Sequence, residues 1–116
     1  MTYQMNLHPG PFALIKNGQK DVEMRLYDER RKVIKVGDII EFTNNETLEK
    51  FSCEVLNLQQ FATFVELYNH YPKERLGYRF DESADPKDME QYYSKYRIMK
   101  YGVLAIEIKL IDVSAR

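Results

Sequence analysis

The sequence predicts one α+β domain over residues 1–116, a small antiparallel or mixed β-barrel of about five to six strands with two to four peripheral helices. Three observations lead to this prediction. The length of 116 residues suits a single domain of ordinary size. The chain is 44% hydrophobic and 30% charged, as folded proteins are. Stretches of alternating apolar and polar residues, typical of strands, are interrupted by stretches with helical spacing.

The first quarter of the chain predicts a strand, a helix and a second strand. Residues 2–7 alternate loosely between apolar and polar side chains. Pro11 suits the start of a helix of about two turns, and Gly18 suits its C-terminal cap. Residues 21–27 have a period of two, so one face of this strand should enter the core while the other carries charge.

The rest of the chain predicts three further strands and two main helices. We expect the strands at 39–42, 50–58 and 101–110, and the helices at 61–71 and 85–96. The first two of these strands would form a hairpin, so that the chain up to residue 58 would be an antiparallel meander with one small helix. Asp85 and Pro86 are the expected N-cap and first residue of the last helix. The final strand begins as a nearly continuous apolar run, typical of burial on both faces.

Charge is almost balanced over the whole chain, with 17 Lys and Arg against 18 Asp and Glu. The basic residues are concentrated between Lys16 and Lys35, and acidic residues between Asp81 and Glu90. Such a chain can present a local basic surface although its net charge is only −1. Two ordinary solvated segments would explain the same pattern.

The cysteine and histidine content excludes several kinds of site. Cys53 is the only cysteine, so we expect a core position for it, no internal disulfide and a reducing compartment. His8 and His70 are isolated, and we expect neither a metal nor a cofactor. No signal-peptide pattern and no apolar run near the roughly 18 residues of a membrane span is present, so we expect a cytoplasmic protein without a membrane partner.

Lys20, Glu23 and Arg25 are the strongest candidates for a functional site. Glu23 and Arg25 are two residues apart on a strand and must share a face, and Lys20 could point the same way from the preceding turn. In a concave setting these three groups could orient a planar polar ligand, contact phosphate or move a proton. The ordinary alternative is an exposed strand face with an ion pair.

Other polar and aromatic residues have simpler explanations. We expect His8 to be structural or exposed in a loop, and His70 to interact with the dipole of the helix that it ends. Four tyrosines could stack on nucleobases, although their spacing favours packing of the last helix: Tyr92, Tyr93, Tyr96 and Tyr101.

A series of motifs runs through nearly the whole chain. It comprises Pro11-Phe12-x-x-Ile15-Lys16-x-Gly18-x-Lys20-x-x-Glu23-x-Arg25-Leu26, Asp28-Glu29-Arg30-Arg31, Val36-Gly37-Asp38-x-Ile40-x-Phe42, and Tyr101-Gly102-Val103-x-Ala105-Ile106. In this order the motifs resemble the ASCH domain family, a branch of the PUA-like barrel superfamily, in its small, single-domain bacterial form. The Gly-x-Lys-x-x-Glu-x-Arg core is the most diagnostic part.

The resemblance implies a PUA-like barrel with a cleft that binds RNA or a modified nucleoside or nucleotide. It implies five ligand-binding residues: Lys20, Glu23, Arg25, Arg30 and Tyr101. An RNA- or nucleotide-binding module is therefore our first interpretation. A barrel whose surface binds another protein is a further alternative.

The resemblance also implies hydrolase chemistry as an alternative function. Some small members of the family are amidohydrolases that act on acetylated cytidine, and others have been described as ribonucleases. By that analogy the catalytic residues would be Lys20, Glu23 and Glu74. The amidohydrolase pattern has a threonine where this chain has Glu23, so the hydroxyl nucleophile is missing. Glu23 could instead activate water while Lys20 or Arg25 stabilises an oxyanion, and we rank binding ahead of hydrolysis.

Overall fold

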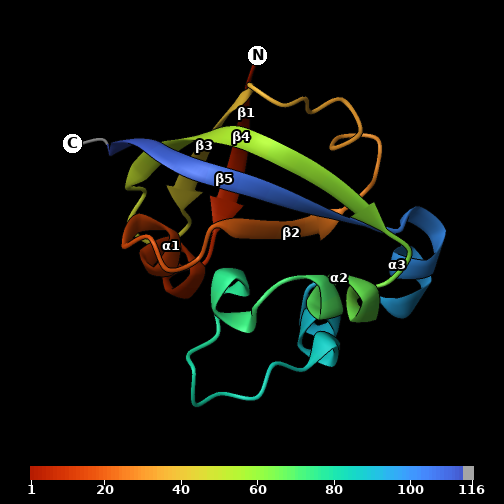
Figure 1. Cartoon of the computed structure of the whole chain (residues 1–116). Coiled ribbons are helices and arrows are strands. Elements are labelled where there is room, and N and C mark those ends of the chain that lie inside the picture. Colours follow the sequence, from red (N-terminus) through yellow and green to blue (C-terminus); the bar gives the residue numbers. More distant parts are fainter. Residues whose placement is uncertain (114–116) are drawn as a thin grey trace.

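The alternating segments of the chain form one curled, five-stranded sheet, which several helices cover (Figure 1). The computed structural model describes residues 1–113. Its strands are β1 (Thr2–Leu7), β2 (Val22–Leu26), β3 (Ile39–Asn44), β4 (Lys50–Phe61) and β5 (Val103–Val113). Its helices are α1 (Pro9–Lys16), α2 (Phe64–His70) and α3 (Lys95–Tyr101), with 3₁₀ helices η1 (Lys73–Leu76) and η2 (Pro86–Gln91). The predicted α+β fold built on a small mixed barrel is confirmed, in the form of a half-barrel.

The strand order is β1-β3-β4-β5-β2. β3, β4 and β5 are antiparallel neighbours, and β2 pairs antiparallel with β5. β1 instead runs parallel to β3, with Met5 opposite Phe42. The expectation of a simple antiparallel meander is therefore wrong for the first two strands. Parallel neighbours need a long crossover connection, which α1 and β2 supply here.

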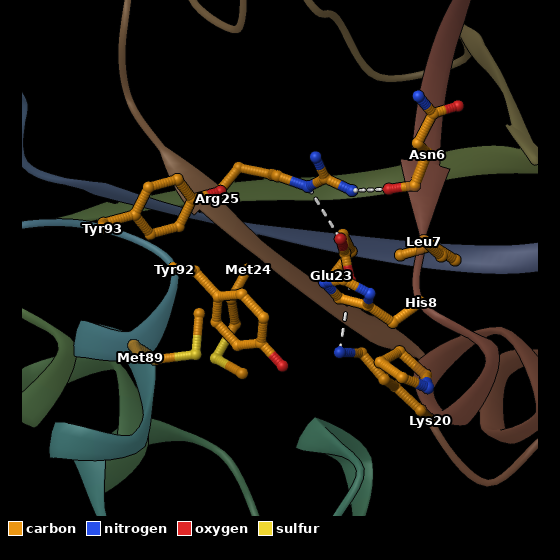
Figure 2. A pocket seen from close by; sticks show the side chains of 11 residues that line it. Asn6, Leu7, His8, Lys20, Glu23, Met24, Arg25, Met89, Tyr92 and Tyr93 are labelled. Carbon is orange, nitrogen blue, oxygen red and sulfur yellow. Dashed lines mark hydrogen bonds and ion pairs between the residues drawn. The ribbon is translucent and has the colours of Figure 1, made fainter. Parts of the chain in front are cut away.

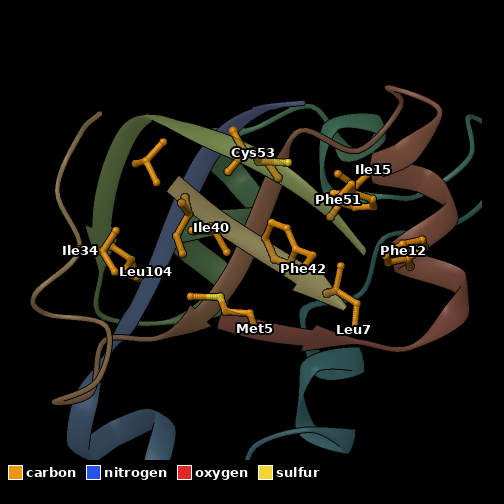
Figure 3. Close-up of a cluster of buried hydrophobic side chains, with 13 residues drawn as sticks. Met5, Leu7, Phe12, Ile15, Ile34, Ile40, Phe42, Phe51, Cys53 and Leu104 are labelled. Carbon is orange, nitrogen blue, oxygen red and sulfur yellow. The ribbon is translucent and has the colours of Figure 1, made fainter. Parts of the chain in front are cut away.

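Two hydrophobic clusters lie on the two faces of the sheet, and β5 contributes to both. Leu104 and Ile106 belong to the cluster inside the curl of the sheet (Figure 3), whereas Val103 and Ala105 pack with the helical side. These four residues are all buried, so the predicted burial of both faces at the start of β5 is confirmed. Cys53 lies in the inner cluster as expected, where burial and the negative charge of Glu23 raise its pKa to about 12.

The helices differ from the prediction in their boundaries. The expected helix over 85–96 is two helices, η2 and α3, because Ser94 provides a second N-cap by accepting a hydrogen bond from the Arg97 N–H. Tyr101 consequently ends α3 and does not begin β5. The expected helix over 61–71 begins only at Phe64, because the preceding residues extend β4 through Phe61, and Thr63 caps it.

β2 is packed on both of its faces, which the alternation alone did not predict. Val22, Met24 and Leu26 belong to the cluster on the helical side. Glu23 lies directly opposite Ile106 in the ladder, and Arg25 lies opposite Leu104. Residues directly opposite each other in an antiparallel pair share a face. The charged face of β2 is therefore turned toward the inside of the half-barrel and is not an ordinary solvent-exposed strand face.

Candidate functional site

Lys20 is held by the turn that ends α1. Gly18 has a φ of 88°, and its N–H donates to the carbonyl of Ile15, so it caps the helix as predicted. The Lys20 N–H then donates to the Leu14 carbonyl at 3.0 Å. The stem of Lys20 lies against the bare Cα of Gly77, where a Cβ would come within 3.2 Å of the lysine Cδ. The turn and this glycine together fix the direction of the lysine.

Glu23 lies between the two cations that sequence analysis placed beside it (Figure 2). Its Oε1 is 3.2 Å from Lys20 Nζ, and its Oε2 is 2.7 Å from Arg25 Nε. Both Lys20 and Glu23 are buried, with 7% and 4% of their surface exposed. The sequence prediction that these three residues lie together is thus realised in the structure, as a buried network and not as an exposed ion pair.

Arg25 also joins the two edges of the sheet. β1 and β2 are the terminal strands in the sheet order, and the curl brings them toward each other. Arg25 Nη2 donates to the carbonyl of Asn6 on β1 at 3.0 Å, while Nε of the same guanidinium donates to Glu23. The planar fork of an arginine suits two such contacts at once. One side chain therefore links β2 to β1 across the mouth of the half-barrel.

The network keeps Glu23 ionised. Burial disfavours the ionised carboxylate and would raise its pKa. The positive charges of Lys20 and Arg25 outweigh this effect and hold the pKa of Glu23 below its usual range. Burial likewise opposes the charge of Arg25, and the adjacent Glu23 raises the pKa of the guanidinium overall. Glu23 Oε1 is buried and has no aligned hydrogen bond, and its ion-pair partner is the Lys20 ammonium, 3.2 Å away. This oxygen remains able to accept a hydrogen bond.

A cavity of about 210 Å³ opens beside this network. Lys20, Glu23 and Arg25 line one wall, and Tyr92 and Tyr93, which follow η2, line another. Tyr92 is 46% exposed, whereas the ring of Tyr93 is stacked on Phe64 with a centroid distance of 6.3 Å. Burial raises the pKa of Tyr93, although the charge of Arg25 opposes this rise. The cavity thus combines buried charges with one available aromatic face.

His8 joins the same cavity, which sequence analysis did not foresee. It is the N-cap residue of α1 and lines the cavity at the end of β1. Its ring centroid is 5.8 Å from that of Tyr92, and its Nδ1 is 3.2 Å from Asn45 Nδ2. The position of Tyr92 and Tyr93 was missed as well, because it depends on the break before α3. Ser94 was the signal in the sequence that could have indicated this break.

A second cavity of about 260 Å³ adjoins the first and shares Lys20, Met24 and Tyr92 with it. Tyr78 donates a hydrogen bond of 2.8 Å to Asp88 in its wall and lies 2.8 Å from the hydroxyl of Tyr68. Burial, together with these two hydrogen bonds, strongly raises the pKa of Tyr78. The second cavity therefore offers hydroxyl and carboxylate groups on the far side of Lys20.

Three other residues named by the sequence analysis lie away from the first cavity. Arg30 is exposed in the turn that follows β2. Glu74 is exposed in η1. Tyr101 ends α3, where Arg97 lies 6.0 Å and Lys100 5.2 Å from its ring centroid. None of the three lines either of the two cavities, so their roles in binding or catalysis stay predictions.

Most basic residues in the segment 16–35 have an acidic partner. Those paired with a carboxylate are Lys16, Lys20, Arg25, Arg31 and Lys32. Five of the seven basic residues in this segment therefore lie next to a carboxylate. Among residues 1–113, no group of three His, Cys, Asp or Glu side chains is placed to hold a metal ion. None of the helices described here is long and apolar enough to cross a bilayer.

Comparisons with known proteins agree on one family. The model of the ASCH domain family matches residues 5–112. The crystal structure of hypothetical protein PH0355 is 33% identical over 96% of this chain and 100% of that chain, with a TM-score of 0.81. Protein PF0455 from Pyrococcus furiosus, solved by NMR, is 30% identical over 96% of this chain and 98% of that chain, with a TM-score of 0.69.

A more distant likeness concerns the fold alone. The crystal structure of ASCH from Zymomonas mobilis is 14% identical over 98% of this chain and 73% of that chain, with a TM-score of 0.66. No curated protein matches the chain.

Proposed function

Because the chain belongs to the ASCH domain family, which is generally thought to bind RNA, we propose that its first cavity binds one base of an RNA or of a modified nucleoside or nucleotide. The observation that carries this proposal is Glu23 Oε1, a buried oxygen of an ionised carboxylate that lines the cavity, pairs with the Lys20 ammonium and has no aligned hydrogen bond. A carboxylate oxygen can accept more than one hydrogen bond, so an N–H group from a ligand would pair with Oε1 beside the lysine.

The wall of the cavity complements the edge of a nucleobase. Glu23 would accept a hydrogen bond from a ring N–H or an exocyclic amino group, while Lys20 and Arg25 would donate to a ring nitrogen or a carbonyl oxygen. The half-exposed ring of Tyr92 is available to stack on the base. Sites for drug-sized ligands usually occupy about 300 to 1,000 Å³. The smaller volume of about 210 Å³ favours a single base, with the second cavity available for an attached sugar.

Calorimetric titration with the four ribonucleosides and acetylated cytidine tests this proposal. Glu23→Gln should weaken binding of the preferred nucleoside about tenfold or more, since a hydrogen bond to a charged group contributes about 1.5 to 3 kcal/mol. Tyr92→Leu should weaken it through loss of stacking, which contributes about 1 to 3 kcal/mol per base. Glu54→Gln on β4 is the matched control and should bind as the wild type does.

Two outcomes would contradict the proposal. One is the absence of saturable binding to any of these nucleosides or to a short RNA. The other is equal affinity in the wild type, Tyr92→Leu and Glu54→Gln. Tyr92→Leu keeps the test decisive if Glu23→Gln fails to fold, because Tyr92 lies outside the buried ion network.

Hydrolysis of an acylated cytidine nucleoside or of an RNA phosphodiester is the second candidate. The close approach of Glu23 Oε1 to Lys20 Nζ in one cavity wall favours it, because a carboxylate could activate water beside a cation that stabilises an oxyanion. The lowered pKa of Glu23 makes it a weak base, and Glu74 lies outside both cavities. We therefore place binding first.

Incubation with acetylated cytidine and with RNA distinguishes the two candidates. Turnover by the wild type that is lost in both Lys20→Ala and Glu23→Gln would favour hydrolysis. Equal turnover in all three proteins would mean that these residues are not the catalysts.

A further inference from the structure

The segment from Gln91 to Tyr101 carries charge of one sign only. It contains Lys95, Arg97 and Lys100, four tyrosines and no acidic residue. The ten residues before it carry five acidic side chains and a single lysine between Asp81 and Glu90. The sign of the surface charge therefore changes where η2 ends.

This cationic segment starts at the wall of the cavity. Tyr92 and Tyr93 line the cavity, and α3 begins two residues later, after the Ser94 cap. At the other end of α3, the carbonyl of Gly102 accepts a hydrogen bond of 3.0 Å from the Tyr27 N–H, one residue after β2. The turn with the exposed Arg30 follows directly. α3 thus connects the cavity wall to the turn that follows β2.

The charges of α3 are available to an outside partner. Lys95, Arg97 and Lys100 are exposed, and within the described residues 1–113 none of them lies within ion-pair distance of a carboxylate. This distinguishes them from the five basic residues of segment 16–35 that lie next to a carboxylate. Tyr96 is 71% exposed on the same helix. Alternating cations and aromatic rings can contact both phosphates and unpaired bases.

We propose that α3 and Arg30 bind the phosphate backbone of a single-stranded RNA while one of its bases occupies the first cavity. This inference rests on the proposed function and adds that the ligand is a polynucleotide and not a free nucleoside. A helix of seven residues is about 10 Å long, so its cations can contact successive phosphates of one bound strand. Because α3 follows directly on the wall of a cavity proposed to hold a base, and because tyrosines can stack on bases, RNA is favoured over an acidic protein as the partner.

The test compares two triple variants that lose the same charge. K95Q/R97Q/K100Q removes the cations of α3, and K35Q/K50Q/K109Q removes three exposed lysines elsewhere on the surface. Each protein is titrated with the four free ribonucleosides and with a random-sequence single-stranded RNA of about eight nucleotides. The RNA titration is repeated over a series of salt concentrations.

The wild type should bind the RNA at least about tenfold more tightly than the preferred nucleoside. The α3 triple variant should lose this advantage, and its slope of log affinity against log salt should fall by about two, since each lost phosphate contact accounts for about 0.7. Its affinity for the nucleoside should not change. The control variant should keep most of the advantage and most of the slope.

Different failures have different meanings. RNA bound no more tightly than the nucleoside, or equal losses in the two triple variants, would overturn this inference and leave the proposed function standing. A wild type that binds neither ligand would overturn both. Equally tight binding of a polyglutamate peptide, abolished by the α3 variant, would assign the surface to an acidic protein and also overturn the inference.

Discussion

Glu23 holds together the buried charges of the site, because its two carboxylate oxygens contact two different cations. Removing one member of a buried ion network leaves the others without compensation, which typically costs about 3 to 5 kcal/mol. Such a network adds little net stability compared with a well-packed apolar core. Its presence inside the mouth of the half-barrel therefore supports the recognition role that we propose for it.

The stability of the protein should depend on the protonation of Glu23. The folded-state pKa lies below the ordinary value of 4.5, so the stabilising contribution is complete above that value and is lost as the pH falls through the lowered pKa. Urea unfolding between about pH 3 and pH 7 measures this loss. Glu23→Gln should lack this component of the acid dependence. An identical pH profile in the variant and the wild type would contradict the assignment.

Gly77 should matter for the ligand as well as for the backbone. Gly77→Ala places a methyl group at a φ of 107°, and this methyl group meets the stem of Lys20. Gly37→Ala is the matched control, since Gly37 has a φ of 93° and open space around it. Both variants should lose about 1 to 2 kcal/mol of unfolding free energy through left-handed strain. Only Gly77→Ala should also weaken nucleoside binding. Equal affinities in the two variants would mean that Gly77 does not position Lys20.

At the scale of the elements, Arg25 provides a hydrogen-bonded link between β2 and β1. The guanidinium of Arg25 reaches both Glu23 and the Asn6 carbonyl, and a lysine ammonium has no planar fork for these two contacts. Arg25→Lys should therefore speed amide hydrogen exchange in β1 and β2 more than in β3 and β4. Arg79→Lys changes an exposed arginine and should leave exchange unaltered. Uniform exchange across the strands of Arg25→Lys would argue against this link.

The positions of the strands could be predicted from the sequence better than their pairing. Period-two alternation is a local property of the chain, and it located β1, β2 and β5 to within a few residues. β1 pairs with β3 in parallel because the connection through α1 and β2 crosses over from one strand to the other. The alternation of apolar and polar residues carries no information about this crossover. The prediction of one helix over 85–96 was wrong. The helical spacing of apolar residues continues past Ser94, but the Ser94 side chain caps the start of a new helix.

At the scale of the whole molecule, the first cavity lies between the half-barrel and the helical layer. β2 supplies Glu23 and Arg25, and the segment after η2 supplies Tyr92 and Tyr93. A bound base would therefore contact both layers. The acidic stretch before Gln91 and the cations of α3 lie on either side of the tyrosines along the chain. This arrangement would favour one direction of approach for a polyanion.

The site could be predicted from the sequence only where its residues are neighbours in the chain. Lys20, Glu23 and Arg25 are close together in sequence, so the geometry of one turn and one strand nearly fixes their proximity. His8 and Tyr92 come from distant segments, and only the folding of η2 against the end of β1 brings them together. Burial of the charged face of β2 depends on the curl of the whole sheet. A local pattern carries no information about that curvature.

Chemical-shift mapping by NMR during titration with the preferred nucleoside tests the central claim most directly. If the first cavity binds the base, the largest backbone shifts should lie at the end of β1, along residues 20–25 and around Tyr92, and they should saturate together. Glu23→Gln should reduce them at the same ligand concentration. Saturating shifts concentrated elsewhere, for example around Tyr27 and Leu58 in the cavity at the opposite end of β2, would contradict the claim.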